Sequence, residues 1–214
     1  MVTLDIFSDP ICPWCYIGKA NLDRALAERP DHGFTIRWRP FMLNPEMSAE
    51  GMDRRAYLEA KFGGPEGAEE AYRPVHEQAE QAGIAMNLDA ITRTPPTHDA
   101  HRLLHWSEIE GVQTAMVSAL FRAYFVEGRD IGDAEVLGDL ADGCGLDASL
   151  IMRLLRSDAD RKEIVEMDAT ARGMGVTAAP TFVVAGRHAV PGAQPPELWT
   201  RVIDELRAGA DPEA

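Results

Sequence analysis

The sequence predicts an α/β fold in two separated parts, a β-α-β segment at the start and an α-β-β-α segment at the end, interrupted by an all-helical insertion. Three observations support this prediction. Apolar residues alternate with period two in two segments near the start of the chain, as they do in half-buried strands, and strand character returns near the end with a hairpin pattern. From about Glu46 to Ser157, helical segments follow one another and are separated by Gly, Pro or Asp. A crossover helix joins the first two strands, so we expect these strands to be parallel.

The first part contains a strand, a helix and a second strand. Residues Val2–Phe7 alternate between apolar and other side chains, which indicates the first strand. A helical run follows from Pro13 to about Glu28 and stops before the turn residues Pro30–Gly33. Residues Phe34–Arg39 combine alternation with high β-propensity and predict the second strand.

The central part contains six predicted helices. Their ranges are Arg54–Phe62, Pro65–Ala82, Asp99–Glu110, Thr114–Phe125, Asp133–Ala141 and Asp147–Leu155. Asp133 and Asp147 stand where N-cap residues are expected. Pro74 interrupts the second of these segments and predicts a kink or a division there, because proline lacks the N–H of the helical hydrogen bond.

The last part returns to mixed structure. We expect a long helix from about Ser157 to Met174, strands at Thr181–Val184 and His188–Val190 joined by a Gly186-Arg187 turn, a closing helix at Pro196–Arg207, and a frayed tail over Gly209–Ala214. The predicted domains are residues 1–45 with 158–214, which form a thioredoxin-like domain, and residues 46–157, which form the helical insertion.

Composition narrows the classes of function. The 214 residues carry a formal net charge of −14, which argues against nucleic acid and anionic membranes as partners. The first residues show neither a basic segment nor a long apolar stretch, and no apolar run reaches the length of a transmembrane helix. We therefore expect a cytoplasmic protein, in which a pair of cysteines near the N-terminus is more often catalytic than structural.

The central chemical motif is Cys12-Pro13-Trp14-Cys15, between the first strand and the first helix. With Cys12 as N-cap and Pro13 as first helical residue, the positive end of the helix dipole favours a thiolate at Cys12. The motif then predicts thiol–disulfide exchange, with Cys12 as nucleophile and Cys15 as resolving thiol. A copper(I) clip or a structural disulfide uses the same spacing. A four-cysteine zinc site within one chain is excluded, because Cys144 is the remaining cysteine.

Three other groups have both a chemical and a structural interpretation. Asp9 is a candidate proton relay for the deprotonation of Cys15, or a turn residue. The three histidines at positions 98, 101 and 105 have helical spacing, but a straight helix makes them a poor metal chelate, so we predict no metal site. Cys144 is expected to be a small buried hydrophobe.

Several motifs together resemble the FrnE-like branch of the DsbA family. They are Asp9-x-x-Cys12-Pro13-Trp14-Cys15-Tyr16-Ile17-Gly18, Ala100-His101-Arg102-Leu103, Phe121-x-Ala123-Tyr124-Phe125-x-Glu127-Gly128-x-Asp130-Ile131, Gly175-Val176-x-x-x-Pro180-Thr181-Phe182 and Gly192-Ala193-Gln194-Pro195. The resemblance covers nearly the whole chain. It implies that Pro180 is a cis-proline facing the dithiol and that Ala179 offers its backbone to an extended substrate. Pro13 and Trp14 are expected to contact substrate as well.

The sequence is also similar to glutathione-dependent relatives, the 2-hydroxychromene-2-carboxylate isomerases and kappa-class glutathione transferases. Those relatives typically have serine where this chain has Cys12, and their late loop carries an aspartate that the 192–195 loop lacks. Asn44 matches a position that they use for glutathione. Three hypotheses follow: a thiol–disulfide oxidoreductase, a glutathione-dependent isomerase or transferase, and a non-catalytic module that holds copper(I) or a peptide.

For the first hypothesis we expect no cofactor beyond the dithiol. The expected partners are protein thiols and disulfides or a small thiol such as glutathione, which is then a co-substrate. We expect no nucleic acid and no membrane as partner, and a homodimer by analogy with relatives.

Overall fold

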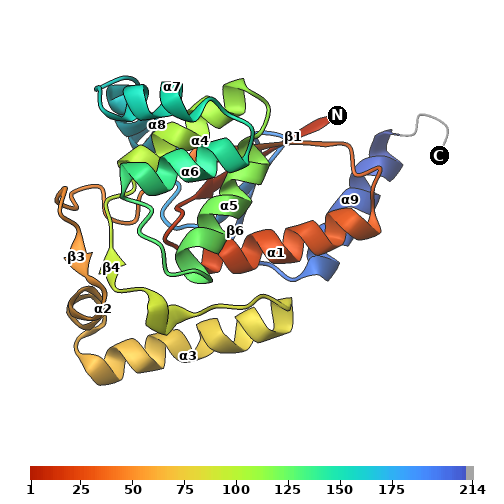
Figure 1. Ribbon diagram of the computed structural model, residues 1–214. Helices are drawn as coiled ribbons and strands as arrows, with labels where there is room; N and C mark the ends of the chain where they lie inside the picture. Colours follow the sequence, from red (N-terminus) through yellow and green to blue (C-terminus); the bar gives the residue numbers. More distant parts are fainter. Residues whose placement is uncertain (211–214) are drawn as a thin grey trace.

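The computed structural model describes residues 1–210 and has a four-stranded sheet at its centre, with strand order β2-β1-β5-β6 (Figure 1). Strand β1 (Val2–Ser8) pairs in parallel with β2 (Phe34–Pro40), as the crossover helix between them requires. Strand β5 (Thr181–Val184) is antiparallel to both β1 and β6 (His188–Pro191). The two predicted parts of the fold therefore meet in one sheet, with β1 next to β5.

The helices follow the predicted order. Helix α1 (Pro13–Glu28) connects β1 to β2, and α9 (Pro196–Ala210) follows β6. Between β2 and β5 lie α2 (Arg54–Phe62), α3 (Pro65–Ala82), the 3-10 turn η1 (Leu88–Ala90), α4 (His98–Ile109), α5 (Gln113–Phe125), α6 (Ala134–Gly143), α7 (Ala148–Leu155) and α8 (Arg161–Gly173).

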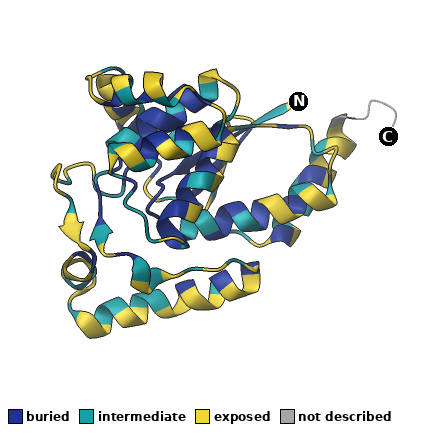
Figure 2. Cartoon of the chain, viewed as in Figure 1, coloured by how far each residue is buried: buried dark blue, intermediate teal, exposed yellow. Residues whose placement is uncertain are grey.

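Different helices cover the two faces of the sheet. Leu4 and Ile6 of β1 belong to the main hydrophobic core, which also contains Trp199 of α9 and residues of α1, α4 and α5. Phe7 points to the opposite face and packs with Ala171 of α8. Figure 2 shows long buried faces on α4 and α5, whereas α3 is mostly exposed or half-buried. The alternation in β1 thus decides which helices each side chain meets.

The insertion differs from the all-helical prediction in one respect. Two short strands, β3 (Met52–Asp53) and β4 (Arg93–Thr94), form an antiparallel pair there. Two-residue strands are too short to leave a periodic pattern in a sequence. The predicted caps are present: the Asp133 carboxylate accepts the N–H of residue 135 and the Asp147 carboxylate that of residue 150.

Helix α3 runs from Pro65 to Ala82 without a break, so Pro74 does not divide it. Proline removes one hydrogen bond and crowds the preceding turn. Packing compensates, because Val75 and Ala79 are buried in a hydrophobic cluster with Ile17 of α1. Contacts that are distant in sequence thus keep both halves of α3 in one helix.

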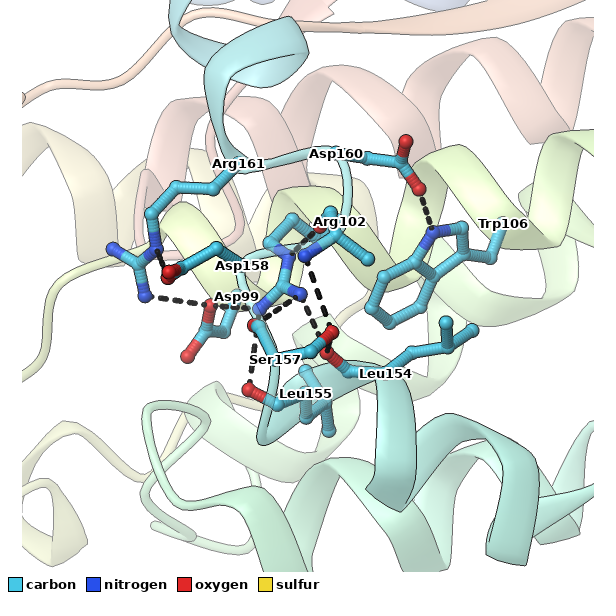
Figure 3. A network of polar contacts seen from close by, with 10 residues as sticks. Asp99, Arg102, Trp106, Leu154, Leu155, Ser157, Asp158, Asp160 and Arg161 are labelled. Carbon is cyan, nitrogen blue, oxygen red and sulfur yellow. Dashed lines mark hydrogen bonds and ion pairs between the residues drawn. The ribbon is translucent and has the colours of Figure 1, made fainter.

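Helix α8 begins at Arg161 and not at Ser157, because a buried arginine shapes the preceding turn (Figure 3). Arg102 is fully buried and donates to the carbonyl oxygens of Leu154 (2.6 Å), Leu155 (3.3 Å), Ser157 (2.8 Å) and Ala159 (2.6 Å), and to the Asp99 carboxylate (2.9 Å). Its guanidinium also lies 5.0 Å from the ring centroid of Trp106. Asp160 then adopts a left-handed conformation with φ 58° before α8 starts.

The remaining predictions concern the ends and the domains. Residues 209 and 210 continue α9, and the rest of the predicted frayed tail, residues 211–214, lies outside the described residues. Within residues 1–210, no helix has both the length and the apolar character that crossing a membrane requires. The division into domains at residues 46 and 157 stays a prediction.

Candidate active site

The two cysteines lie at the N-terminal end of α1. Cys12 is the N-cap residue in extended conformation, and Pro13 occupies the first helical turn, where its missing N–H removes no helical bond. The thiols of Cys12 and Cys15 are free, and these residues are 3% and 1% exposed. The turn is closed by Cys12 N–H donating to Asp9 O (2.9 Å) and Cys15 N–H donating to Cys12 O (3.1 Å). This arrangement places a dithiol at the positive end of a helix dipole.

The loop before β5 meets the dithiol from the other side. The Cys12 thiol donates to the carbonyl oxygen of Ala179 (3.5 Å), which is half-buried, and the Ala179–Pro180 peptide bond is cis. Gly18 of α1 permits this close approach. A Cβ at position 18 would lie 3.3 Å from both Pro180 Cγ and Phe182 Cζ. Cys12, Ala179 and Pro180, which are far apart in sequence, thus form one site.

The buried thiol of Cys15 has an unfavourable environment for ionisation. Burial raises the pKa of Cys15 well above its ordinary value, and the neighbouring Cys12 sulfur raises it further. The Ser8 hydroxyl and the Asp9 backbone act in the opposite direction and lower it. A raised pKa keeps the Cys15 thiol protonated, so it must pass its proton to an acceptor before it can attack a disulfide.

Asp9 is completely buried one turn before Cys12. Its Oδ1 accepts the N–H of Ile11 (3.3 Å), and its Oδ2 accepts the N–H of Leu43 (2.7 Å) and the hydroxyl of Thr97 (3.4 Å). Burial raises the pKa of Asp9 to about 6, although these hydrogen bonds and the positive charge of Lys61 lower it in part. The carboxyl therefore ties the dithiol loop to two other segments and also titrates near neutral pH.

His101 of α4 is a further titratable neighbour of Asp9. Its Nε2 lies 3.9 Å from Asp9 Oδ1, and the side chain is almost fully buried. Burial lowers the pKa of His101 to about 3, so the imidazole is neutral at pH 7 and the contact is not an ion pair. His101 was not among the residues predicted for this site, because α4 is far from Asp9 in sequence; its place in the Ala100–Leu103 motif was the available signal.

Asn44 lies just after the segment that Asp9 holds. Its Oδ1 accepts a hydrogen bond from the Tyr57 hydroxyl (3.0 Å). That hydroxyl in turn accepts a hydrogen bond from Lys61 Nζ (2.8 Å). Its Nδ2 is buried and has no hydrogen-bond partner among the described residues. A buried amide nitrogen without a hydrogen-bond partner is a candidate for ligand contact.

Helices α2 and α3 contribute further groups that no sequence motif indicated. Arg54 is buried and donates to Thr94 Oγ1 (3.3 Å) and, over a short contact, to the Tyr72 hydroxyl. Burial raises the pKa of Tyr72, Arg54 lowers it, and Cys12 lies near enough to raise it slightly. Trp14 is half-buried and packs against the cluster of Ile17 and α3 residues. Only the packing of the insertion places these helices beside the dithiol.

Of the three histidines at positions 98, 101 and 105, only His105 lies in a cluster of potential metal ligands within the described residues. Within the described residues 1–210, His105, Asp160 and Glu163 each place one ligand atom within 4.8 Å of the others. His98 and His101 are not part of this group. The Asp160 carboxylate also accepts the Trp106 indole N–H (2.8 Å), and His105 Nδ1 is buried without a hydrogen-bond partner among those residues.

Comparison with known proteins assigns the family. The model of the DSBA-like thioredoxin domain matches residues 3–204, and the chain therefore belongs to this family. The α/β fold with its helical insertion, predicted above, is confirmed by this match and by the solved relatives.

Three solved structures are similar over nearly the whole chain. The probable DsbA oxidoreductase SCO1869 from Streptomyces coelicolor is 32% identical, with a TM-score of 0.85, and the match covers 100% of this chain and 93% of the other. A 2-hydroxychromene-2-carboxylate isomerase is 21% identical, with a TM-score of 0.72 and coverage of 99% and 100%. The cytosolic disulfide reductase DsbM from Pseudomonas aeruginosa, solved with GSH, is 21% identical, with a TM-score of 0.70 and coverage of 96% and 99%. The family and these neighbours support a thiol oxidoreductase or a related enzyme.

Proposed function

We propose that the protein is an FrnE-like thiol–disulfide oxidoreductase that exchanges disulfides through Cys12 and Cys15. One observation carries the proposal: two free thiols lie at the N-terminal end of α1, with Cys12 Sγ 3.5 Å from the carbonyl oxygen of Ala179. Such a dithiol faces both the positive end of a helix dipole and a backbone segment available for an extended substrate.

The proposed reaction has two exchange steps. The Cys12 thiolate attacks one sulfur of a substrate disulfide, so that a mixed disulfide forms and one substrate thiolate leaves. Cys15 then loses its proton to the Asp9 carboxylate and attacks Cys12 Sγ, which releases the second substrate thiolate and leaves a Cys12–Cys15 disulfide. Pro13, Trp14, Ala179 and Pro180 line the approach to Cys12 in this proposal. The reverse sequence oxidises a substrate dithiol.

The test uses reduced protein and glutathione disulfide, with the products identified by mass spectrometry. We expect the wild type to form an intramolecular disulfide, Cys15→Ser to stop at a glutathione adduct, and Cys12→Ser to form neither. Cys144→Ser is the matched control, because Cys144 lies outside the site, and it should behave as the wild type. Exchange that survives in Cys12→Ser contradicts the proposal.

A second function has support from a specific observation. The buried Asn44 Nδ2 has no partner among the described residues, and the two cysteines are almost inaccessible, which favours a small thiol such as glutathione over a large substrate. A glutathione-dependent isomerase or transferase would show saturable glutathione binding by calorimetry, weakened in Asn44→Ala. Its turnover would survive Cys15→Ser, whereas the oxidoreductase reaction would not.

We further propose that the protein works in the cytoplasm, with protein thiols or glutathione as partners, and that it forms a homodimer. One structural neighbour, DsbM, is a cytosolic disulfide reductase, which supports the first point by analogy. Fractionation of cells and analytical ultracentrifugation of the purified protein test location and assembly; a monomer at micromolar concentration contradicts the dimer.

A further inference from the structure

The side chain of His101 presents an unusual unpaired atom. Its Nε2 is buried and has no hydrogen-bond partner within residues 1–210, and the whole residue is 3% exposed. An unpaired buried polar atom destabilises a fold, so its presence calls for an explanation. The group that it faces is the Asp9 carboxyl, 3.9 Å away.

The hydrogen bonds of Asp9 explain why a facing acceptor matters. Ile11, Leu43 and Thr97 all donate to its carboxylate oxygens. These donors suit the ionised form, but a protonated carboxyl has an O–H that needs an acceptor. A neutral imidazole offers one, because one of its ring nitrogens carries no proton. A small side-chain rotation that shortens the 3.9 Å separation by about 1 Å would bring Nε2 of His101 within hydrogen-bond distance.

We propose that His101 is a positioning residue for the resolving step, whose Nε2 accepts a hydrogen bond from the Asp9 carboxyl once that carboxyl has taken the proton of Cys15. The inference rests on the proposed oxidoreductase function and deepens it. His101 touches neither thiol in this scheme and acts through Asp9.

The step balances within the site and its substrate. The S–H bond of Cys15 breaks, and its proton goes to Asp9. The electron pair of Cys15 sulfur forms the bond to Cys12 Sγ, while the bond between Cys12 and the substrate sulfur breaks. The substrate sulfur leaves as a thiolate with that electron pair, so the substrate disulfide is reduced and the protein dithiol is oxidised.

Other charged groups also act on the Asp9 and His101 pair. The negative charge of Asp168 in α8 raises the pKa of His101. His98, one turn earlier on α4, lowers it. Arg172 pairs with Asp168 (2.7 Å), which reduces the influence of that carboxylate. Lys61 of α2 favours the ionised form of Asp9. Burial outweighs these charges at both groups and keeps His101 neutral, which is the state that can accept.

The experiment uses 5,5′-dithiobis(2-nitrobenzoate) as the substrate disulfide. Attack by Cys12 releases one thionitrobenzoate, and attack by Cys15 on the mixed disulfide releases a second, so absorbance separates the two steps in one stopped-flow trace. The rates are measured from pH 5 to 8 for the wild type, His101→Leu and His101→Gln, each also carrying Cys144→Ser, because the free Cys144 thiol would otherwise release thionitrobenzoate as well. Leucine cannot accept a hydrogen bond, whereas the glutamine side chain can.

We expect the second phase of His101→Leu to be about tenfold slower, with its inflection about one pH unit lower, since a loss of one pKa unit is tenfold in proton affinity. The second phase of His101→Gln should be slower than that of the wild type by about threefold at most, which corresponds to about half a pKa unit. Equal rates and pH profiles in all three proteins overturn the inference. Failure of glutamine to restore the rate also overturns it, because the loss then reflects packing. Absence of any second release in the wild type instead contradicts the proposed function itself.

Nuclear magnetic resonance gives an independent test on the unmodified chain. Long-range ¹H–¹⁵N spectra distinguish the protonated from the unprotonated imidazole nitrogen. We expect Nε2 of His101 to be the unprotonated nitrogen from pH 5 to 8. A protonated Nε2 in this range overturns the inference even if His101→Leu does not fold.

Discussion

The Arg102 cluster, defined by Arg102 and the groups it binds, and the dithiol site are both polar and buried, but their hydrogen bonding differs. Arg102 makes five hydrogen bonds, four of them to backbone carbonyl oxygens (Figure 3). At the dithiol site, His101 Nε2 and Asn44 Nδ2 are buried and unpaired among the described residues.

This difference separates two roles of buried polar groups. A saturated cluster contributes to stability and fixes the course of the chain, here the turn before α8. A cluster with unpaired atoms gives up part of that stability and keeps groups available for a proton or a ligand. The comparison predicts that substitutions in the first cluster change mainly the free energy of unfolding, and that substitutions in the second change mainly pH dependence and binding.

The largest expected effect on stability belongs to Arg102→Met. The substitution removes five hydrogen bonds, four of them to backbone carbonyl oxygens, while Asp99 keeps its pairing with Arg161. It should lower the free energy of unfolding by about 3–5 kcal/mol, because several acceptors lose a donor at once. Urea denaturation measures this effect. Arg161→Met is the matched control: Arg161 pairs with the same Asp99 but is 46% exposed, so a loss of at most about 1 kcal/mol is expected. Similar losses in both variants would contradict the comparison.

Asp9→Asn should change how stability depends on pH. The pKa of Asp9 is raised in the folded state, from 3.8 to about 6, so its contribution to stability is fully present below pH 3.8 and is lost as pH rises through 6. Asparagine does not ionise, so the variant does not lose stability in this way as the pH rises. The stability of the variant relative to the wild type should therefore increase by about 3 kcal/mol between pH 3.5 and 7.5, from about two pKa units.

Urea titrations at several pH values measure this change. Asp142→Asn is a suitable control, because it makes the same chemical change at an exposed position on α6. A constant difference for Asp9→Asn would show that Asp9 is an ordinary turn residue.

The smallest effects sharpen the comparison between two buried amides. Gln113 is fully paired, since it accepts from Trp38 N–H (2.9 Å) and donates to the Trp38 (3.0 Å) and Leu104 (3.3 Å) carbonyl oxygens. Gln113→Ala should lower stability by about 2–3 kcal/mol, because backbone groups are left unpaired. Asn44→Ala should lower it by about 1 kcal/mol or less, because one neutral hydrogen bond is lost. Thermal unfolding with both variants measures the difference, and the reverse order would contradict it.

The sequence by itself predicted most of the elements and the chemical centre. Periodicity and β-propensity located the helices and the strands β1, β2 and β5, because each buries apolar side chains in the core, whereas β6 was located by the Gly186-Arg187 turn before it. The spacing of Cys12 and Cys15 and the position of Pro13 placed the dithiol at a helix N-terminus, since both are local properties of the chain. The caps Asp133 and Asp147 were visible for the same reason.

Tertiary structure decided what depends on contacts between distant segments. The start of α8 follows from Arg102, the continuity of α3 through Pro74 follows from packing against Ile17, and the pairing of β3 with β4 joins residues about 40 positions apart. The same is true of the neutral His101 beside Asp9. Burial sets the charge of these two groups, and burial is a property of the assembled core that neither residue type nor spacing contains.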